Sequence, residues 1–190
     1  MFYRFIRGVA WFVLRLAFRI KVTGVENIPN EGAFLLCGNH ISALDAPILA
    51  TCVRRQLYFM AKKELFKNRL FAAFFYALGV FPVDRGGTDM QAYRRSMEIL
   101  ENENGLMIFS QGHRMNDFEN FKGGAAVFAL KTGAPIVPVG IKSQYRFRST
   151  VHINVGLPIS MKPYEGQKVK SDLVTEVMEV VVSHITKLAQ

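Results

Sequence analysis

His40 and Asp45 are the two residues whose types and spacing most directly suggest chemistry. They follow an apolar run at residues 34–38, so a strand end, a turn and a helix start would let the carboxylate fold back toward the imidazole. A continuous helix would instead turn two positions five apart by about 140°. Pro47 favours a helix start, because proline is tolerated in a first helical turn.

A histidine beside a carboxylate can act as a general base. Asp45 would keep one ring nitrogen of His40 protonated and leave the other to take a proton from a hydroxyl nucleophile. By spacing alone a simpler interpretation stands beside it, in which Asp45 caps a helix and His40 is a loop residue. Two such residues five apart occur often by chance, so the pair needs support from the rest of the chain.

Strands and helices alternate along the chain after residue 20. The expected strands are residues 20–23, 34–38, 57–61, 80–83, 106–109, 136–141 and 151–155, and the expected helices are residues 45–53, 65–78, 89–101, 124–132 and 171–188. The segment 65–78 is apolar and rich in Phe, so we expect a buried helix there. The alternation predicts an α/β fold, with a mostly parallel or mixed central sheet and flanking helices, in a single domain over residues 21–190.

Residues 1–20 form a separate amphipathic segment. Four basic side chains project into an arc of about 120° on a helical wheel, and most of the remaining wheel is apolar; they are Arg4, Arg7, Arg15 and Arg19. Charges at these positions disfavour a membrane span. The pattern predicts a helix that lies in the plane of an anionic bilayer. The alternative is a domain helix that packs its apolar face on the core.

The net charge and the cysteine content limit which classes of binding partner, disulfide and metal site we expect. The chain has 190 residues and a formal net charge of +9, which predicts an anionic partner: nucleic acid, an acidic membrane surface or a phosphorylated substrate. The cations near predicted strand ends form no continuous stripe, and no base-stacking motif is present, so we expect no nucleic acid partner. Cys37 and Cys52 form no CxxC pair or Cys/His cluster, so we expect neither a disulfide framework nor a metal site.

Four blocks of the sequence resemble the signature blocks of one family. Residues 38–49 read GNHISALDAPIL, which resembles the first block of the glycerolipid acyltransferases, the PlsC-like family of 1-acylglycerol-3-phosphate acyltransferases. Residues 79–85, 109–114 and 136–139 resemble the other three blocks, in the expected order. The resemblance covers roughly residues 20–160, and four ordered blocks are far more specific than one.

This resemblance implies an activity. The family moves an acyl chain from an acyl-CoA or acyl-carrier-protein thioester to the free hydroxyl of 1-acylglycerol-3-phosphate, which gives phosphatidic acid. We therefore expect a peripheral or monotopic protein at the cytoplasmic face of the cell membrane, with no cofactor besides the thioester co-substrate. His40 would deprotonate the acceptor hydroxyl and Asp45 would fix its tautomer. No G-x-S-x-G sequence is present, which agrees with direct attack by the acceptor.

The phosphate of such an acceptor requires cationic hydrogen-bond donors. Four candidates follow predicted strands: Arg85, Arg114, Lys62 and Lys63. Each alone could be a solvated surface charge, but together they could converge at one end of the sheet, opposite His40.

The third block departs from the family pattern, which usually has Pro-Glu-Gly-Thr-Arg. Gly112 is retained, while Gln111 stands in place of the glutamate and His113 precedes the arginine. We expect Gln111 and Gly112 to belong to the acceptor site, because glutamine keeps an acceptor oxygen. The lost charge leaves two alternatives open: another lysophospholipid acceptor, or a catalytically weakened lipid-binding protein of the same fold.

Overall fold

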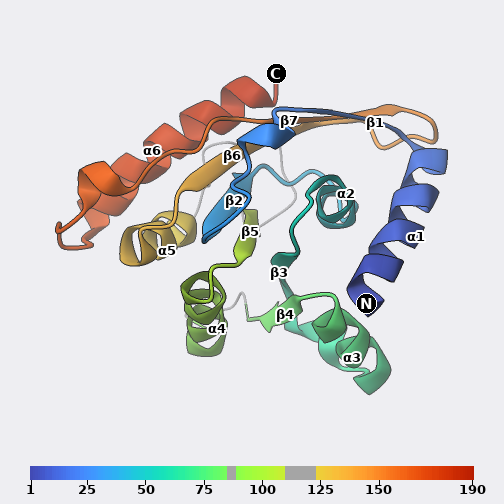
Figure 1. The fold of residues 1–190 in the computed structure, drawn as a ribbon, viewed down its shortest axis with the longest axis horizontal. Coiled ribbons are helices and arrows are strands. Elements are labelled where there is room, and N and C mark those ends of the chain that lie inside the picture. The colour runs from blue at the N-terminus through green and yellow to red at the C-terminus, as the bar shows by residue number, and fades with distance from the viewer. Residues whose placement is uncertain (85–88, 110–122) are drawn as a thin grey trace.

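The computed structural model describes residues 1–84, 89–109 and 123–190 of the chain. Within these ranges the strands form one seven-stranded sheet, in the order β1-β7-β6-β2-β5-β3-β4 (Figure 1). The strands are β1 (Arg19–Thr23), β2 (Phe34–Gly38), β3 (Leu57–Lys62), β4 (Val80–Val83), β5 (Gly105–Phe109), β6 (Ile136–Lys142) and β7 (Thr150–Val155). Strands β2 to β6 are parallel to one another, while β7 runs antiparallel to β6 and pairs in parallel with β1. The predicted α/β fold with a mixed sheet is confirmed.

Helices cover both faces of this sheet. The described helices are α1 (Phe2–Ala17), α2 (Asp45–Cys52), α3 (Arg69–Ala77), α4 (Met90–Glu101), α5 (Gly124–Thr132) and α6 (Ser171–Leu188). Figure 1 shows α4, α5 and α6 along one face, with α1 and α2 on the other. Side chains alternate along a strand, so Leu35 of β2 packs toward α4–α6 while Leu36 packs toward α1 and α2. Burial on both faces explains why residues 34–38 form an unbroken apolar run.

The carboxyl ends of the parallel strands lie together along one side of the sheet, which we call its carboxyl edge. This is not the same as the outermost strands of the sheet, β1 and β4. In the register, Gly38 at the end of β2 is opposite Phe109 of β5 and Val139 of β6. A Cβ atom at Gly38 would lie 2.9 Å from the carbonyl oxygen of Val139, so this close approach requires glycine. Lys62 of β3 is opposite Val83 of β4 at the same edge. The segments that follow these strands therefore start side by side.

The segment 65–78 differs from its prediction. A 3₁₀ turn (Lys63–Phe66) comes first, and α3 then begins after Asn68, whose side chain accepts hydrogen bonds from the N–H groups of Leu70 and Phe71. Within this fully described helix no residue is buried, and Leu70 is 83% exposed. The prediction of a buried helix is wrong, because α3 lies beside the edge strand β4, where no further strand or helix of the described chain covers its outer side.

The N-terminal helix is shorter than predicted and is held by one face. It ends at Ala17 rather than residue 20, because Phe18 adopts an extended backbone and places its ring in the core. Arg7 Nη1 donates hydrogen bonds to the carbonyl oxygens of Val53 and Arg54 at the end of α2 (3.0 and 2.8 Å), so this arginine anchors α1 to the domain. The other side stays exposed: Phe5 is 67% exposed. The packing side agrees with a domain helix that contacts the core, and binding of the exposed side to a bilayer stays a prediction.

No helix within the described residues is long and apolar enough to cross a membrane.

Candidate active site

A buried pair formed by His40 and Asp45 lies at the carboxyl edge of the sheet. His40 Nδ1 is 2.7 Å from Asp45 Oδ2, and the two residues are 8% and 1% exposed. Asp45 is the first residue of α2, and its Oδ2 also accepts hydrogen bonds from the backbone N–H groups of Ile41 and Ser42, both at 2.8 Å. These two bonds fold the turn between β2 and α2 around the carboxylate. The strand end, turn and helix start therefore bring the two side chains together, as the sequence predicted.

The surroundings of the imidazole fix its tautomer and its plane. Because an ionised carboxylate only accepts hydrogen bonds, the contact with Asp45 places the ring proton on Nδ1 and leaves Nε2 as the basic nitrogen. The ring stacks on Phe109 at the end of β5, with centroids 4.1 Å apart and planes inclined by 18°. Nε2 is therefore held in one orientation, as a general base requires.

Asn39 ties the end of β2 to β6. Its side-chain amide donates to the carbonyl oxygen of Ile141 and accepts from the N–H of the same residue, both at 2.8 Å. This buried amide extends the ladder between the two strands by one more pair of bonds and fixes the backbone next to His40. Asn39 was not predicted from the sequence, although a polar residue between a buried strand and a histidine was a usable signal.

Tyr145, in the connection between β6 and β7, is a second residue of the site that was not predicted from the sequence. Its Oη donates a hydrogen bond to Asp45 Oδ1, the carboxylate oxygen that does not face His40. The carboxylate thus accepts from the imidazole, two backbone N–H groups and one phenol. No sequence signal identified Tyr145, because 100 positions separate it from Asp45.

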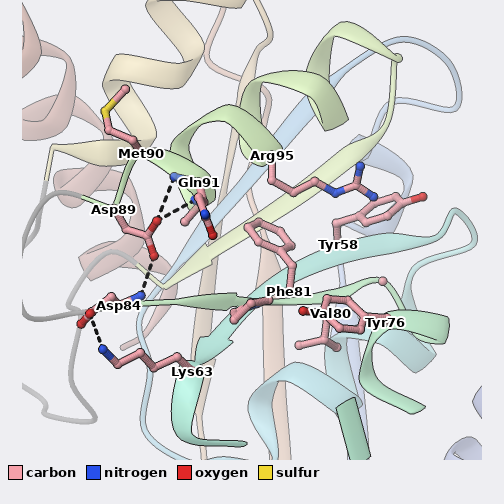
Figure 2. Close-up of a pocket in the computed structure, with 13 residues that line it drawn as sticks. Tyr58, Lys63, Tyr76, Val80, Phe81, Asp84, Asp89, Met90, Gln91 and Arg95 are labelled. Carbon is pink, nitrogen blue, oxygen red and sulfur yellow. Dashed lines mark hydrogen bonds and ion pairs between the residues drawn. The ribbon is translucent and has the colours of Figure 1, made fainter. Parts of the chain in front are cut away.

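Lys62 and Lys63 lie at the same edge of the sheet as His40. Lys62 is the last residue of β3 and Lys63 follows it. Strand β3 is two strands from β2 and hence about 10 Å away across the sheet. Lys62 is exposed, whereas Lys63 forms an ion pair with Asp84, the residue after β4 (Figure 2). The hydrogen bond and charge of Asp84 raise the pKa of Lys63, which stays protonated. Both side chains are exposed, but Lys63 is already paired with an acid.

Arg85, Gln111, Gly112, His113 and Arg114 lie outside the described residues.

The described residues that border Arg85 are linked to each other. Asp89 Oδ2 accepts a hydrogen bond from the N–H of Asp84 (2.8 Å), and its Oδ1 accepts from the N–H groups of Gln91 and Ala92, which caps α4. The N–H groups of Ala92 and Asp84 lower the pKa of Asp89. This network fixes where the chain leaves β4 and where it enters α4.

A cavity of about 690 Å³ lies between β3, β4 and the start of α4 (Figure 2). The described residues that line it include Tyr58, Phe81 and Arg95, with Lys63 and Asp84 at one side, and neither His40 nor Asp45. Phe81 belongs to the core on the α4–α6 face, whereas the Phe109 ring that stacks on His40 packs on the opposite face. The cavity therefore opens on the other side of the sheet from the imidazole.

Among residues 1–84, 89–109 and 123–190, no group of three or more His, Cys, Asp or Glu side chains is arranged to hold a metal ion.

Comparison with known proteins identifies the family. The Acyltransferase family model matches residues 19–142. A 1-acyl-sn-glycerol-3-phosphate acyltransferase of Bacillus subtilis (strain 168) is 30% identical over 137 residues, which cover 72% of this chain and 69% of that protein. A protein of the same name from Streptococcus pneumoniae is 30% identical over 170 residues, which cover 85% of this chain and 64% of that protein. The chain thus spans about two thirds of the length of these relatives.

A solved structure shares the fold. The crystal structure of the 1-acyl-sn-glycerophosphate (LPA) acyltransferase PlsC from Thermotoga maritima matches with a TM-score of 0.75 and 27% sequence identity, and the match covers 98% of this chain and 79% of that one. The family model includes both His40 and Asp45. With a match over most of its length and two relatives at 30% identity, the chain belongs to the acyltransferase family.

Proposed function

We propose that this protein transfers a fatty acyl chain from an acyl-CoA or acyl-carrier-protein thioester to the free hydroxyl of 1-acylglycerol-3-phosphate, which gives phosphatidic acid. The observation that carries the proposal is the buried His40–Asp45 pair at the carboxyl edge of an acyltransferase-family sheet. The relatives named for this reaction support the choice of acceptor.

The geometry supports direct transfer with His40 as general base. Nε2 of His40 takes the proton from the acceptor hydroxyl as the oxygen attacks the thioester carbonyl carbon. Asp45 stabilises the imidazolium that forms, because its charge lies against Nδ1 in a site shielded from water. When the tetrahedral intermediate collapses, the C–S bond breaks and the imidazolium returns the proton to the leaving thiolate. The reaction balances with the thioester as the only co-substrate.

The acceptor phosphate would bind along the same edge of the sheet. Lys62 is exposed there, two strands from β2, and the +9 net charge favours an anionic ligand. Arg85 and Arg114 are proposed as the bidentate donors to this phosphate, since a guanidinium matches phosphate geometry better than an ammonium. Gln111 and Gly112 are proposed to complete the acceptor site.

The protein is proposed to meet its lipid substrate at the cytoplasmic face of the membrane through α1 and α3. The rings of Phe2 and Phe74 touch edge to face, with centroids 6.3 Å apart, so the two helices form one apolar surface. We call it the α1–α3 surface; its exposed apolar residues are Phe2, Phe5, Val9, Trp11, Phe12, Val13, Leu16, Leu70, Phe71, Phe74 and Tyr76. Arg4 and Arg15 are exposed on α1, and Arg15 lies over the Trp11 ring at 5.0 Å. Aromatic and basic side chains together are typical of binding to anionic headgroups.

One assay tests the reaction. Purified protein is incubated with lysophosphatidic acid and either a long-chain acyl-CoA or the matching acyl-carrier protein, and phosphatidic acid is measured by mass spectrometry. We expect product from the wild type, none above background from His40→Ala, and wild-type rates from His184→Ala, which removes an exposed imidazole on α6. Product from His40→Ala at the wild-type rate would refute the mechanism. Transfer only to another lysophospholipid would refute the acceptor, and lipid binding without transfer would favour the lipid-binding alternative.

A vesicle assay tests the membrane surface. Phe5→Ser combined with Phe12→Ser should reduce co-sedimentation with anionic phospholipid vesicles by more than about tenfold. Each substitution removes a ring whose burial in the bilayer contributes about 1.5–3 kcal/mol to the free energy of binding. Both side chains are more than half exposed, so the melting temperature should change little. Leu157→Ser removes an equally exposed apolar side chain after β7 and should leave binding unchanged. Unchanged binding of the double variant would contradict the proposal.

A further inference from the structure

Tyr145 connects the buried pair to the N-terminal helix. Its hydroxyl donates to Asp45 Oδ1, while its ring packs edge-on against Phe18, with centroids 5.7 Å apart and planes inclined by 82°. Phe18 directly follows α1, which ends at Ala17. The phenol thus contacts the carboxylate on one side and the base of α1 on the other.

The backbone at Tyr145 is held in an unfavourable conformation. Its φ of +49° lies in the left-handed region, which residues other than glycine seldom adopt. Ser143 Oγ accepts a hydrogen bond from the Tyr145 N–H (3.0 Å), and the N–H of Arg148 donates to the carbonyl oxygen of Ala17 (2.6 Å). These contacts hold the connection between β6 and β7 in a conformation in which the phenol reaches Asp45.

The direction of the hydrogen bond follows from the charges. Burial raises the pKa of Tyr145, and the hydrogen bond and negative charge of Asp45 raise it further. The phenol therefore stays protonated and is the donor, and the carboxylate stays the acceptor.

We propose that Tyr145 is a positioning residue of the transfer reaction, which acts on His40 through Asp45; this inference rests on the proposed function. The phenol fixes the rotation of the carboxylate, so that Oδ2 keeps facing His40 Nδ1. It also withdraws negative charge from the carboxylate. A carboxylate without this donor can rotate away from His40 Nδ1, which is the cause of the expected loss in rate, and where it does face the ring it binds the imidazolium more strongly. Tyr145 lies beyond residues 19–142, the range of the family match, so family membership alone does not assign it this role.

Tyr145→Phe tests this role, because it keeps the ring against Phe18 and removes only the hydroxyl. We expect kcat to fall by about 10- to 100-fold, the range set by the net free energy of a hydrogen bond to a charged group, with the KM for lysophosphatidic acid unchanged. The acid limb of the pH–rate profile should move to higher pH, since the imidazolium becomes more stable. Every other titratable group is the same in the wild type and in Tyr145→Phe, so a difference between their pH–rate profiles comes from the loss of this one hydroxyl. Tyr164→Phe, in the 3₁₀ turn Lys162–Tyr164, should leave kcat and profile unchanged.

Two further measurements separate this role from a structural one. Site-specific 3-fluorotyrosine at position 145 makes the phenol a stronger donor and should move the acid limb to lower pH, a displacement that partial unfolding does not produce. The downfield proton resonance of His40 Nδ1–H should differ between wild type and Tyr145→Phe, whether or not transfer is observed. A wild type that makes no phosphatidic acid refutes the proposed function. An unchanged resonance, or an unchanged kcat and profile in an active protein, refutes the role of Tyr145.

Discussion

Replacing Asp45 with asparagine removes one charge from the buried pair and keeps its shape. The asparagine oxygen can stand where Asp45 Oδ2 stands and accept from His40 and from the two backbone N–H groups of the turn. Its amide N–H₂ then faces Tyr145, whose hydroxyl can rotate to accept. Asp45→Asn is therefore a test of charge rather than of folding.

The expected loss follows from the geometry of the pair. Oδ2 lies 2.7 Å from Nδ1, and two unit charges whose centres are about 4 Å apart attract by about 4 kcal/mol at an effective dielectric constant of 20. That attraction exists only when the imidazole is protonated, which is in the transition state and the intermediate. Its loss should lower kcat by about 10³-fold.

The assay is steady-state formation of phosphatidic acid from lysophosphatidic acid and an acyl thioester, with a thermal melt of each protein. Asp172→Asn, which removes an exposed carboxylate in the first turn of α6, is the matched control and should keep wild-type kcat. A folded Asp45→Asn protein whose kcat lies within tenfold of the wild type would refute the role of the buried charge.

Three further changes have outcomes that follow from the structure. Asp89→Ala removes the cap of α4, which costs about 1 kcal/mol and should lower the melting temperature by about 2–4 °C. Because the pKa of Asp89 is lowered from 3.8, the difference in melting temperature should be largest at neutral pH and should shrink in melts recorded at a pH below the folded-state pKa. Asn39→Ala leaves two buried backbone groups of β6 unsatisfied, so urea unfolding should show a loss of about 1–3 kcal/mol per group. Gly140→Ala would place a Cβ atom 2.2 Å from the backbone of Leu188 and should lower the melting temperature, whereas Gly8→Ala meets no atom within 4 Å and should not.

Local patterns were sufficient for the parts of the fold whose contacts are local. The unbroken apolar run at residues 34–38 predicts a strand, and the structure confirms the strand and shows that it is buried on both faces. The segment 65–78 shows the opposite case, because an apolar composition does not state which surface covers it. Strand β4 lies at the edge of the sheet, so the helix beside it is exposed. The order of strands, which decides this, is not encoded in any short stretch of sequence.

For the charged residues too, the sequence predicts where they lie along the chain, and the tertiary structure decides which partners they have. The sequence predicts that Lys62 and Lys63 follow a strand, but it does not distinguish them. The parallel pairing of β3 with β4 brings Asp84 to Lys63, and Lys62 stays exposed. Arg7 likewise belongs to the basic arc of the N-terminal helix by pattern, yet the packing of α1 on α2 turns it into an anchor.

The sequence placed His40 and Asp45 where they could pair, because a strand, a four-residue turn and a helix start hold both groups within one short stretch of chain, and the structure shows that they do. Only the tertiary structure decided what surrounds them. Phe109 and Asn39 act there because β5 and β6 flank β2, and Tyr145 reaches Asp45 because the connection after β6 folds over the same edge. Long-range contacts of this kind depend on strand order, which is set by how the whole core packs.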